Sequence, residues 1–202
     1  MTAAQDQFGG LEAVRRQFEA THQEARELAG TMSEAEFNWH PASGSWSIGQ
    51  CLQHLATGTD AVLPAIDRTI ATARERQYVS QGPVRYGLLA RTMVTSMEPP
   101  VKWRMKTNRM FQPRGEILHR DAVLAELAAS RTRILERVRQ ADGLHLRRAI
   151  VVSPVSRLIR VPLGAYLAFL AAHDRRHLWQ ARQVREASGF GQSATFGAPQ
   201  AS

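Results

Sequence analysis

The sequence predicts an all-α protein folded as an antiparallel four-helix bundle, and three observations support this prediction. Apolar residues recur at three- and four-residue steps in four separate stretches. Helix-start and helix-stop residues bound most of these stretches. One long irregular segment separates the second stretch from the third, as in bundles with a crossover connection. The 202 residues suit one domain, which we place at residues 1–187, followed by a flexible tail over residues 188–202.

The first two helices are predicted at residues 5–29 and from Ser47 onward. The first shows an amphipathic pattern and stops near Gly30, before a loop. Ser47 and Gln50 have the spacing of a capping box, with Trp46 at the position of a hydrophobic staple. The second helix has an apolar face of Cys51, Leu55, Gly58, Val62, Ala65 and Ile66. Pro64 lies inside this pattern and predicts a kink rather than an end.

The long connection and the last two helices follow. Residues 84–97 are compatible with a short helix, which Pro99 and Pro100 stop. Residues 101–120 are basic and interleaved with aromatic side chains, a pattern that fits either a nucleic-acid groove or, as we prefer, an ordered connection covering the bundle. The third helix is predicted at 120–141. Two β-branched stretches, Ala149–Val152 and Leu158–Val161, predict a short hairpin before the last helix.

Two histidines lie four residues apart in the apolar run Leu163–Val184. On a helix, His173 and His177 share one face, with Cβ atoms about 5–6 Å apart, and point inward while the neighbouring arginines point away. Both imidazoles can therefore reach one metal ion. Two separately hydrogen-bonded core histidines are the alternative. His54 borders the apolar face of the second helix, where, taken alone, a hydrogen-bonded core histidine is the preferred interpretation.

Composition restricts the function classes. No apolar run is long enough to span a membrane, and no secretory signal is evident. Cys51 is the single cysteine, so no internal disulfide can form, which fits the cytoplasm. The formal charge is +8, with 18 basic and 7 acidic residues in 101–202. This basic half attracts anionic ligands, but arginine-rich composition does not by itself indicate nucleic-acid binding.

Two separated motifs give the chain a family resemblance. The stretches Trp39-His40-Pro41, Trp46–Leu55 and His173–Gln180, in this order and on these helices, resemble the DinB-like superfamily. The resemblance covers about Phe8 to Ala187. It implies that His54, His173 and His177 are the ligands of one divalent metal ion, which is zinc, nickel or iron(II) in such proteins. Three protein ligands leave open positions, as in catalytic sites.

The resemblance also implies an activity. Characterised bundles of this kind often act on low-molecular-weight thiols, so we expect a metal-dependent thiol transferase with the thiol as co-substrate. A metal-dependent hydrolase and a non-catalytic bundle are the alternatives. We expect a small-molecule substrate, anionic if the arginines hold it, a homodimer, and neither a specific nucleic acid nor a membrane as partner.

Three further residues are candidates near the predicted site. Cys51 lies three residues before His54 and could be a fourth ligand, although a small core residue is the preferred interpretation. His22 lies near the core face of the first helix and could also be a ligand. Asp174 lies about 100° around the helix from His173, so we predict a surface salt bridge with a neighbouring arginine rather than a bond to the imidazole.

Overall fold

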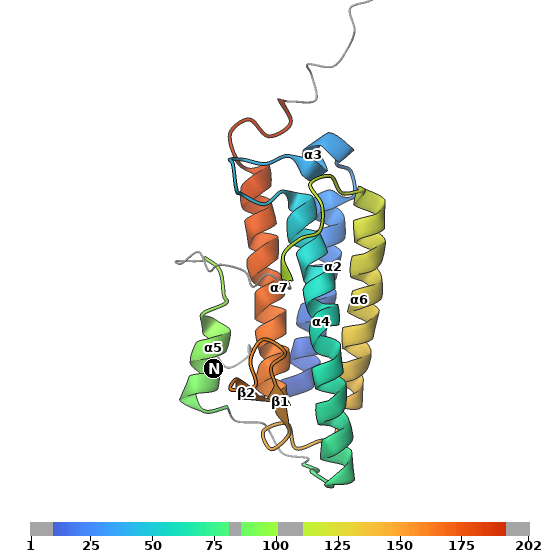
Figure 1. Cartoon of the computed structure of the whole chain (residues 1–202), viewed down its shortest axis with the longest axis vertical. Coiled ribbons are helices and arrows are strands. Elements are labelled where there is room, and N and C mark those ends of the chain that lie inside the picture. The colour runs from blue at the N-terminus through green and yellow to red at the C-terminus, as the bar shows by residue number, and fades with distance from the viewer. Residues whose placement is uncertain (1–9, 81–85, 101–110, 193–202) are drawn as a thin grey trace, which may run out of the picture.

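The computed structural model describes residues 10–80, 86–100 and 111–192. Four long helices form a bundle, which confirms the predicted fold (Figure 1). They are α2 (Gly10–Ala29), α4 (Ile48–Glu75), α6 (Arg120–Gln140) and α7 (Leu163–Arg185). Helices α2 and α4 each pack against both α6 and α7, so α6 and α7 lie at opposite corners. The long crossover brings the chain back to the start of α4, and α4 and α6 therefore run in the same direction (Figure 1).

The predicted capping box begins α4. The Ser47 hydroxyl accepts a hydrogen bond from the Gln50 amide at 3.1 Å, and the Gln50 side-chain oxygen accepts one from the Ser47 amide at 3.3 Å. These bonds satisfy two backbone donors that a helix start otherwise leaves unpaired. The helix continues through Pro64, whose ring is exposed. The first helix begins at Gly10 among the described residues, and the predicted positions 5–9 lie outside them.

A short helix, α3 (Glu34–Asn38), lies where the sequence predicted only loop. Ser33 and Glu36 form a second capping box, with the Glu36 carboxylate 2.8 Å from the Ser33 amide. The fully buried Phe37 packs directly over Gly49 of α4. A Cβ at position 49 would lie 2.6 Å from that ring, so the contact requires glycine there.

The crossover contains α5 (Leu88–Thr95), inside the predicted short helix, and residues 101–110 of the basic segment lie outside the described ranges. The predicted hairpin is present as antiparallel strands β1 (Ile150–Val152) and β2 (Arg160–Pro162), with Val151 opposite Val161. The hairpin leads directly into α7, because Pro162 is its N-cap residue.

The core consists of two hydrophobic clusters, one toward each end of the bundle. Helix α7 contributes buried residues of 163–172 to one cluster and residues from Leu178 onward to the other. His173 and His177 lie in the stretch between them. The core therefore changes from aliphatic to polar at this level. Beyond α7, Phe190 packs edge-on against Trp39 at 5.6 Å, and residues 193–202 of the predicted tail lie outside the description.

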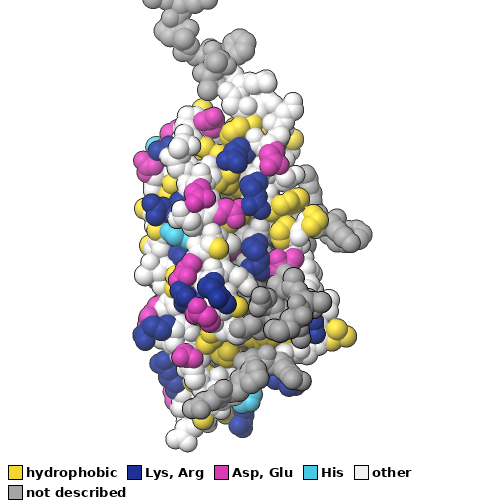
Figure 2. Space-filling view, turned by 180° about the vertical axis from the view of Figure 1, so that it is seen from behind, with side chains coloured by type: hydrophobic (Ala, Val, Ile, Leu, Met, Phe, Trp, Pro, Cys, Tyr) yellow, Lys and Arg dark blue, Asp and Glu magenta, His cyan; other side chains and the backbone are white. Residues whose placement is uncertain are grey.

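The outer surface carries both signs of charge. Figure 2 shows basic and acidic side chains interspersed over the back face of the bundle. Arg15 pairs with Glu12 and Glu19 on α2, and Arg139 pairs with Glu136 on α6. None of the described helices is long and apolar enough to cross a membrane.

Candidate metal centre

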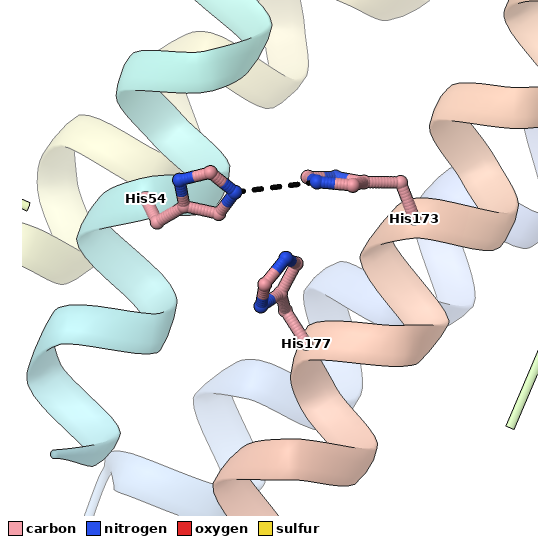
Figure 3. Close-up of side chains that lie close together, drawn as sticks. All are labelled: His54, His173 and His177. Carbon is pink, nitrogen blue, oxygen red and sulfur yellow. Dashed lines mark hydrogen bonds between the residues drawn. The ribbon is translucent and has the colours of Figure 1, made fainter. Parts of the chain in front are cut away.

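Three histidine rings from two helices converge on one point. His54 projects from α4, and His173 and His177 project from α7, with the three rings facing one another (Figure 3). The ring centroids lie 4.4–5.1 Å apart. One nitrogen of each ring lies within 4.8 Å of the other two. Within the described ranges, this is the one group of three or more His, Cys, Asp or Glu side chains with such geometry.

Hydrogen bonds on the far side fix the orientation of two of these rings. His54 Nδ1 lies 2.6 Å from the carbonyl oxygen of Phe111, and His177 Nδ1 lies 3.1 Å from the side-chain oxygen of Gln180. Both oxygens accept, so each Nδ1 carries the proton and donates it. The Nε2 atoms of both rings are therefore left with free lone pairs, which is the state that binds metals.

Burial keeps all three imidazoles neutral. His54 and His177 are buried, and His173 is partly exposed. Burial lowers the pKa of His173 to about 3, aided by the nearby His54 and Arg176. Burial also lowers the pKa of His54 and, together with the neighbouring His173, holds that of His177 well below its usual range. Neutral imidazole is the form that coordinates a metal ion.

The cluster holds more acceptors than donors. His54 Nε2 and His173 Nε2 are 3.2 Å apart, and only His173 has a proton to place between them. The His177 lone pair faces the same space, so one proton cannot satisfy all three rings. A cation can. Two nitrogens bound to one tetrahedral zinc ion at 2.0–2.1 Å lie about 3.3 Å apart, close to the 3.2 Å between His54 Nε2 and His173 Nε2, and the three ligand atoms all lie within 4.8 Å of one another.

Aromatic side chains enclose two sides of the cluster. The Trp46 ring stacks on His177 at 5.6 Å and 22°, and lies 5.0 Å from His54. Phe169 stacks on His173 at 6.3 Å. Trp46 therefore does more than staple the start of α4, because its ring also limits access of water to the imidazoles. A less polar surrounding strengthens electrostatic interactions inside such a site.

The other candidate ligands lie outside the cluster. Cys51 is fully buried in the core, which agrees with the preferred interpretation of this residue. Burial there raises the pKa of its thiol. His22 is not part of the cluster, and its Nδ1 has no hydrogen-bond partner among the described residues.

The prediction that Asp174 forms a salt bridge on the surface was wrong. Its carboxylate is 1% exposed and pairs at 2.5 Å with Arg131 of α6, which is itself 4% exposed. The salt bridge is therefore buried in the bundle and not on its surface. The helical wheel placed Asp174 correctly away from His173, but the salt bridge is made with Arg131 rather than with an arginine next to it in the sequence. The partner comes from α6, which a wheel of one helix cannot show.

Two groups that orient the histidines were not assigned from the sequence. Gln180 lies three residues after His177, a spacing that places both on one helix face and could have indicated the contact. The second group is the Phe111 carbonyl, which belongs to the backbone of the crossover. No side-chain pattern marks a backbone acceptor, so sequence inspection has no signal for it.

Comparison with known proteins agrees with this architecture. A family model described as the DinB superfamily matches residues 17–181. The structure is similar to that of YfiT from Bacillus subtilis, with a TM-score of 0.59 and 12% identity over 94% of this chain and 91% of that chain. That protein is described as "a probable metal-dependent hydrolase with an unusual four-helix bundle topology". No curated protein matches the chain in sequence.

Proposed function

The chain belongs to the DinB superfamily, and on this premise we propose that it is a metal-dependent enzyme whose divalent ion is held by His54, His173 and His177. The convergence of three neutral imidazoles with surplus lone pairs carries the proposal. Zinc, nickel and iron(II) all accept imidazole nitrogen. When bound, such an ion supplies Lewis acidity that lowers the pKa of a nucleophile at an open position.

The residues of the chain have separate tasks in this proposal. Gln180 and the Phe111 carbonyl hold the protons on Nδ1 and thereby aim Nε2 of His177 and His54. Trp46 and Phe169 keep water from the sides of the rings that they cover. The substrate we propose is a small molecule, for which an anionic group would be attracted by the basic second half of the chain.

The nucleophile we favour is a low-molecular-weight thiol, which makes the enzyme a thiol transferase. A thiol has a pKa of about 8.5, which a bound metal ion would lower further, so its proton would pass to solvent near neutral pH. Three histidine ligands would leave an open position on the ion at which such a thiol could bind.

A metal-dependent hydrolase is the second candidate, and the description of the similar YfiT structure favours it. In this version the nucleophile is water, which three imidazoles can also activate through a bound ion. The same three histidines hold the metal in both candidates. The candidates therefore differ in the co-substrate and not in the site.

Metal binding tests the proposal first. We expect purified protein to bind one equivalent of zinc or nickel, and His54→Ala, His173→Ala and His177→Ala each to weaken binding at least about 100-fold, measured by chelator competition. His145→Ala is the control, since His145 lies outside the cluster, and its affinity should not change. Sub-stoichiometric metal after reconstitution, or equal loss in the His145 variant, would refute the proposed ligand set.

Activity assays then separate the two candidates. Loaded protein is incubated with an electrophile and each of several thiols, and conjugate formation is followed by mass spectrometry. Ester and amide substrates are offered without thiol in parallel. Conjugation that requires both metal and thiol supports the transferase, whereas metal-dependent turnover without thiol supports the hydrolase. Metal binding without either reaction would contradict the transferase and favour a non-catalytic bundle.

A further inference from the structure

We propose that the buried ion pair between Arg131 and Asp174 is a positioning device for the metal centre, which sets the rotation of α7 so that His173 and His177 face His54. The inference rests on the proposed function, because it assigns a task to two residues that do not touch the proposed metal. Neither residue belongs to the histidine cluster.

The pair connects three helices at the level of the histidines. Arg131 of α6 contacts the Asp174 carboxylate of α7 at 2.5 Å, and its guanidinium lies 4.8 Å from the centre of the Phe18 ring of α2. The Thr21 hydroxyl of α2 lies 3.5 Å from the same carboxylate oxygen, while it donates to the Gln17 carbonyl at 3.0 Å. Since α6 and α7 occupy opposite corners of the bundle, the pair crosses its centre. Asp174 follows His173 directly, so any movement of one moves the other.

The packing of α7 includes both small and large side chains. Its buried face is rich in small side chains that are at most 1% exposed, namely Ala165, Ala168, Ala171, Ala172 and Ala181. Alanines present a smooth surface, whereas ridges of larger side chains interlock with grooves on the neighbouring helix. Larger buried side chains also pack along α7, namely Leu163, Leu167, Leu170 and Leu178, and Arg175 and Arg182 of α7 pair with Glu98 and Glu24. The Arg131–Asp174 pair adds a buried polar contact next to His173, made through Arg131 Nη2, while Nε and Nη1 have no hydrogen-bond partner among the described residues.

The metal centre demands this accuracy. Side-chain tips lie about 5–6 Å from a helix axis, so a rotation of about 20° moves a ring by about 2 Å. Metal–ligand distances have to be held to within about 0.2 Å, which corresponds to a rotation of only about 2°. A buried ion pair is seldom more stabilising than apolar residues of the same size, so a role in specificity explains its presence better than stability does.

The experiment separates positioning from stability with an apolar replacement. In the double variant Arg131→Met with Asp174→Leu, no charge is left buried and unpaired, and we expect a thermal midpoint close to that of the parent. We also expect the zinc dissociation constant to rise at least about tenfold. A merely structural pair would change both quantities together or neither. Unchanged zinc affinity in a folded double variant would overturn the inference.

A second ion pair on α6 provides the matched control. Arg137 contacts Asp67 of α4 at 2.8 Å, but this pair is partly exposed and does not involve α7. The double variant Arg137→Met with Asp67→Leu should bind zinc within about twofold of the parent. If both double variants lost affinity equally, the effect would be a general one of charge removal, and the positioning role would be refuted.

Two further measurements keep the inference testable if the double variant does not fold or the parent binds no zinc. Arg131→Lys keeps the charge but loses the planar guanidinium that lies over the Phe18 ring, and it should weaken zinc binding several-fold and alter the absorption spectrum of bound cobalt(II). In metal-free crystals of Arg131→Lys, the distance between His54 Nε2 and His173 Nε2 should exceed the 3.2 Å present in the parent. An unchanged distance refutes positioning, whereas a parent without zinc affinity refutes the proposed function alone.

Discussion

Two faces of α7 bury polar groups in opposite ways. Toward α4, burial makes His173 and His177 neutral and leaves lone pairs directed at one point. Toward α6, burial raises the pKa of Asp174, and the charge of Arg131 at 2.5 Å opposes this shift without cancelling it. The first face is therefore incomplete without a cation, while the second pairs its buried charge within the protein, although Arg131 Nε and Nη1 have no hydrogen-bond partner among the described residues. In the role proposed for the ion pair, the contact with α6 holds α7 in place while the histidine face is left free to bind an ion.

The largest expected effect comes from removing one partner of the buried Arg131–Asp174 ion pair. Asp174→Ala leaves Arg131 charged and unpaired inside the bundle, so we expect the free energy of unfolding to fall by about 3–5 kcal/mol. Urea denaturation of the metal-free protein measures this loss. Asp67→Ala is the control, because Asp67 is 43% exposed and its pair with Arg137 contributes at most about 1 kcal/mol. Equal losses of stability in the two variants would show that the buried ion pair matters no more than the partly exposed one.

A smaller effect is expected from removing the hydrogen bond that orients His177. Gln180→Leu removes the acceptor of the His177 Nδ1 proton, and loss of such an outer partner typically weakens metal binding about 10–100-fold. Zinc competition with a chelator measures the change. Gln183→Leu is the matched control on the same helix, since Gln183 is exposed and its side chain donates to Glu186. Gln180 has no part in orienting the ring if the two variants bind zinc equally.

The smallest expected effect is the pH dependence of the stability of the metal-free protein. The pKa of His173 is lowered to about 3, so between pH 6.5 and 5 the unfolded chain binds more protons than the folded one. The metal-free protein should therefore lose stability as the pH falls, by at most about 1.4 kcal/mol per pH unit for each such histidine. Urea midpoints at several pH values measure the slope. We expect His173→Phe to flatten it, and a slope equal to that of the parent would show that His173 is not held neutral by burial.

The sequence allowed the bundle and much of the candidate site to be predicted, for local reasons. Ser47 and Gln50 marked the start of α4 because a capping box depends only on residues three apart. The four-residue spacing of His173 and His177 likewise set their common face. The short helix α3 was missed although Ser33 and Glu36 form the same motif, because its five residues are too few to show periodicity.

The remaining features depend on contacts between distant segments. Asp174 was placed on the surface because its partner, Arg131, is 43 positions away on another helix. His54 joined the other histidines only through the family resemblance, since no spacing connects it to α7. The native metal, the thiol, the homodimer and the cytoplasmic location are not decided by the geometry and stay predictions.

The Phe111 carbonyl accepts a hydrogen bond from His54 Nδ1, so the backbone of the crossover helps to orient a candidate metal ligand. Every amino acid supplies the same carbonyl oxygen, so replacing the side chain at position 111 does not remove this acceptor. An insertion or deletion in the crossover would move it. The position of the backbone at Phe111 is therefore tied to the candidate metal centre, whatever side chain stands there.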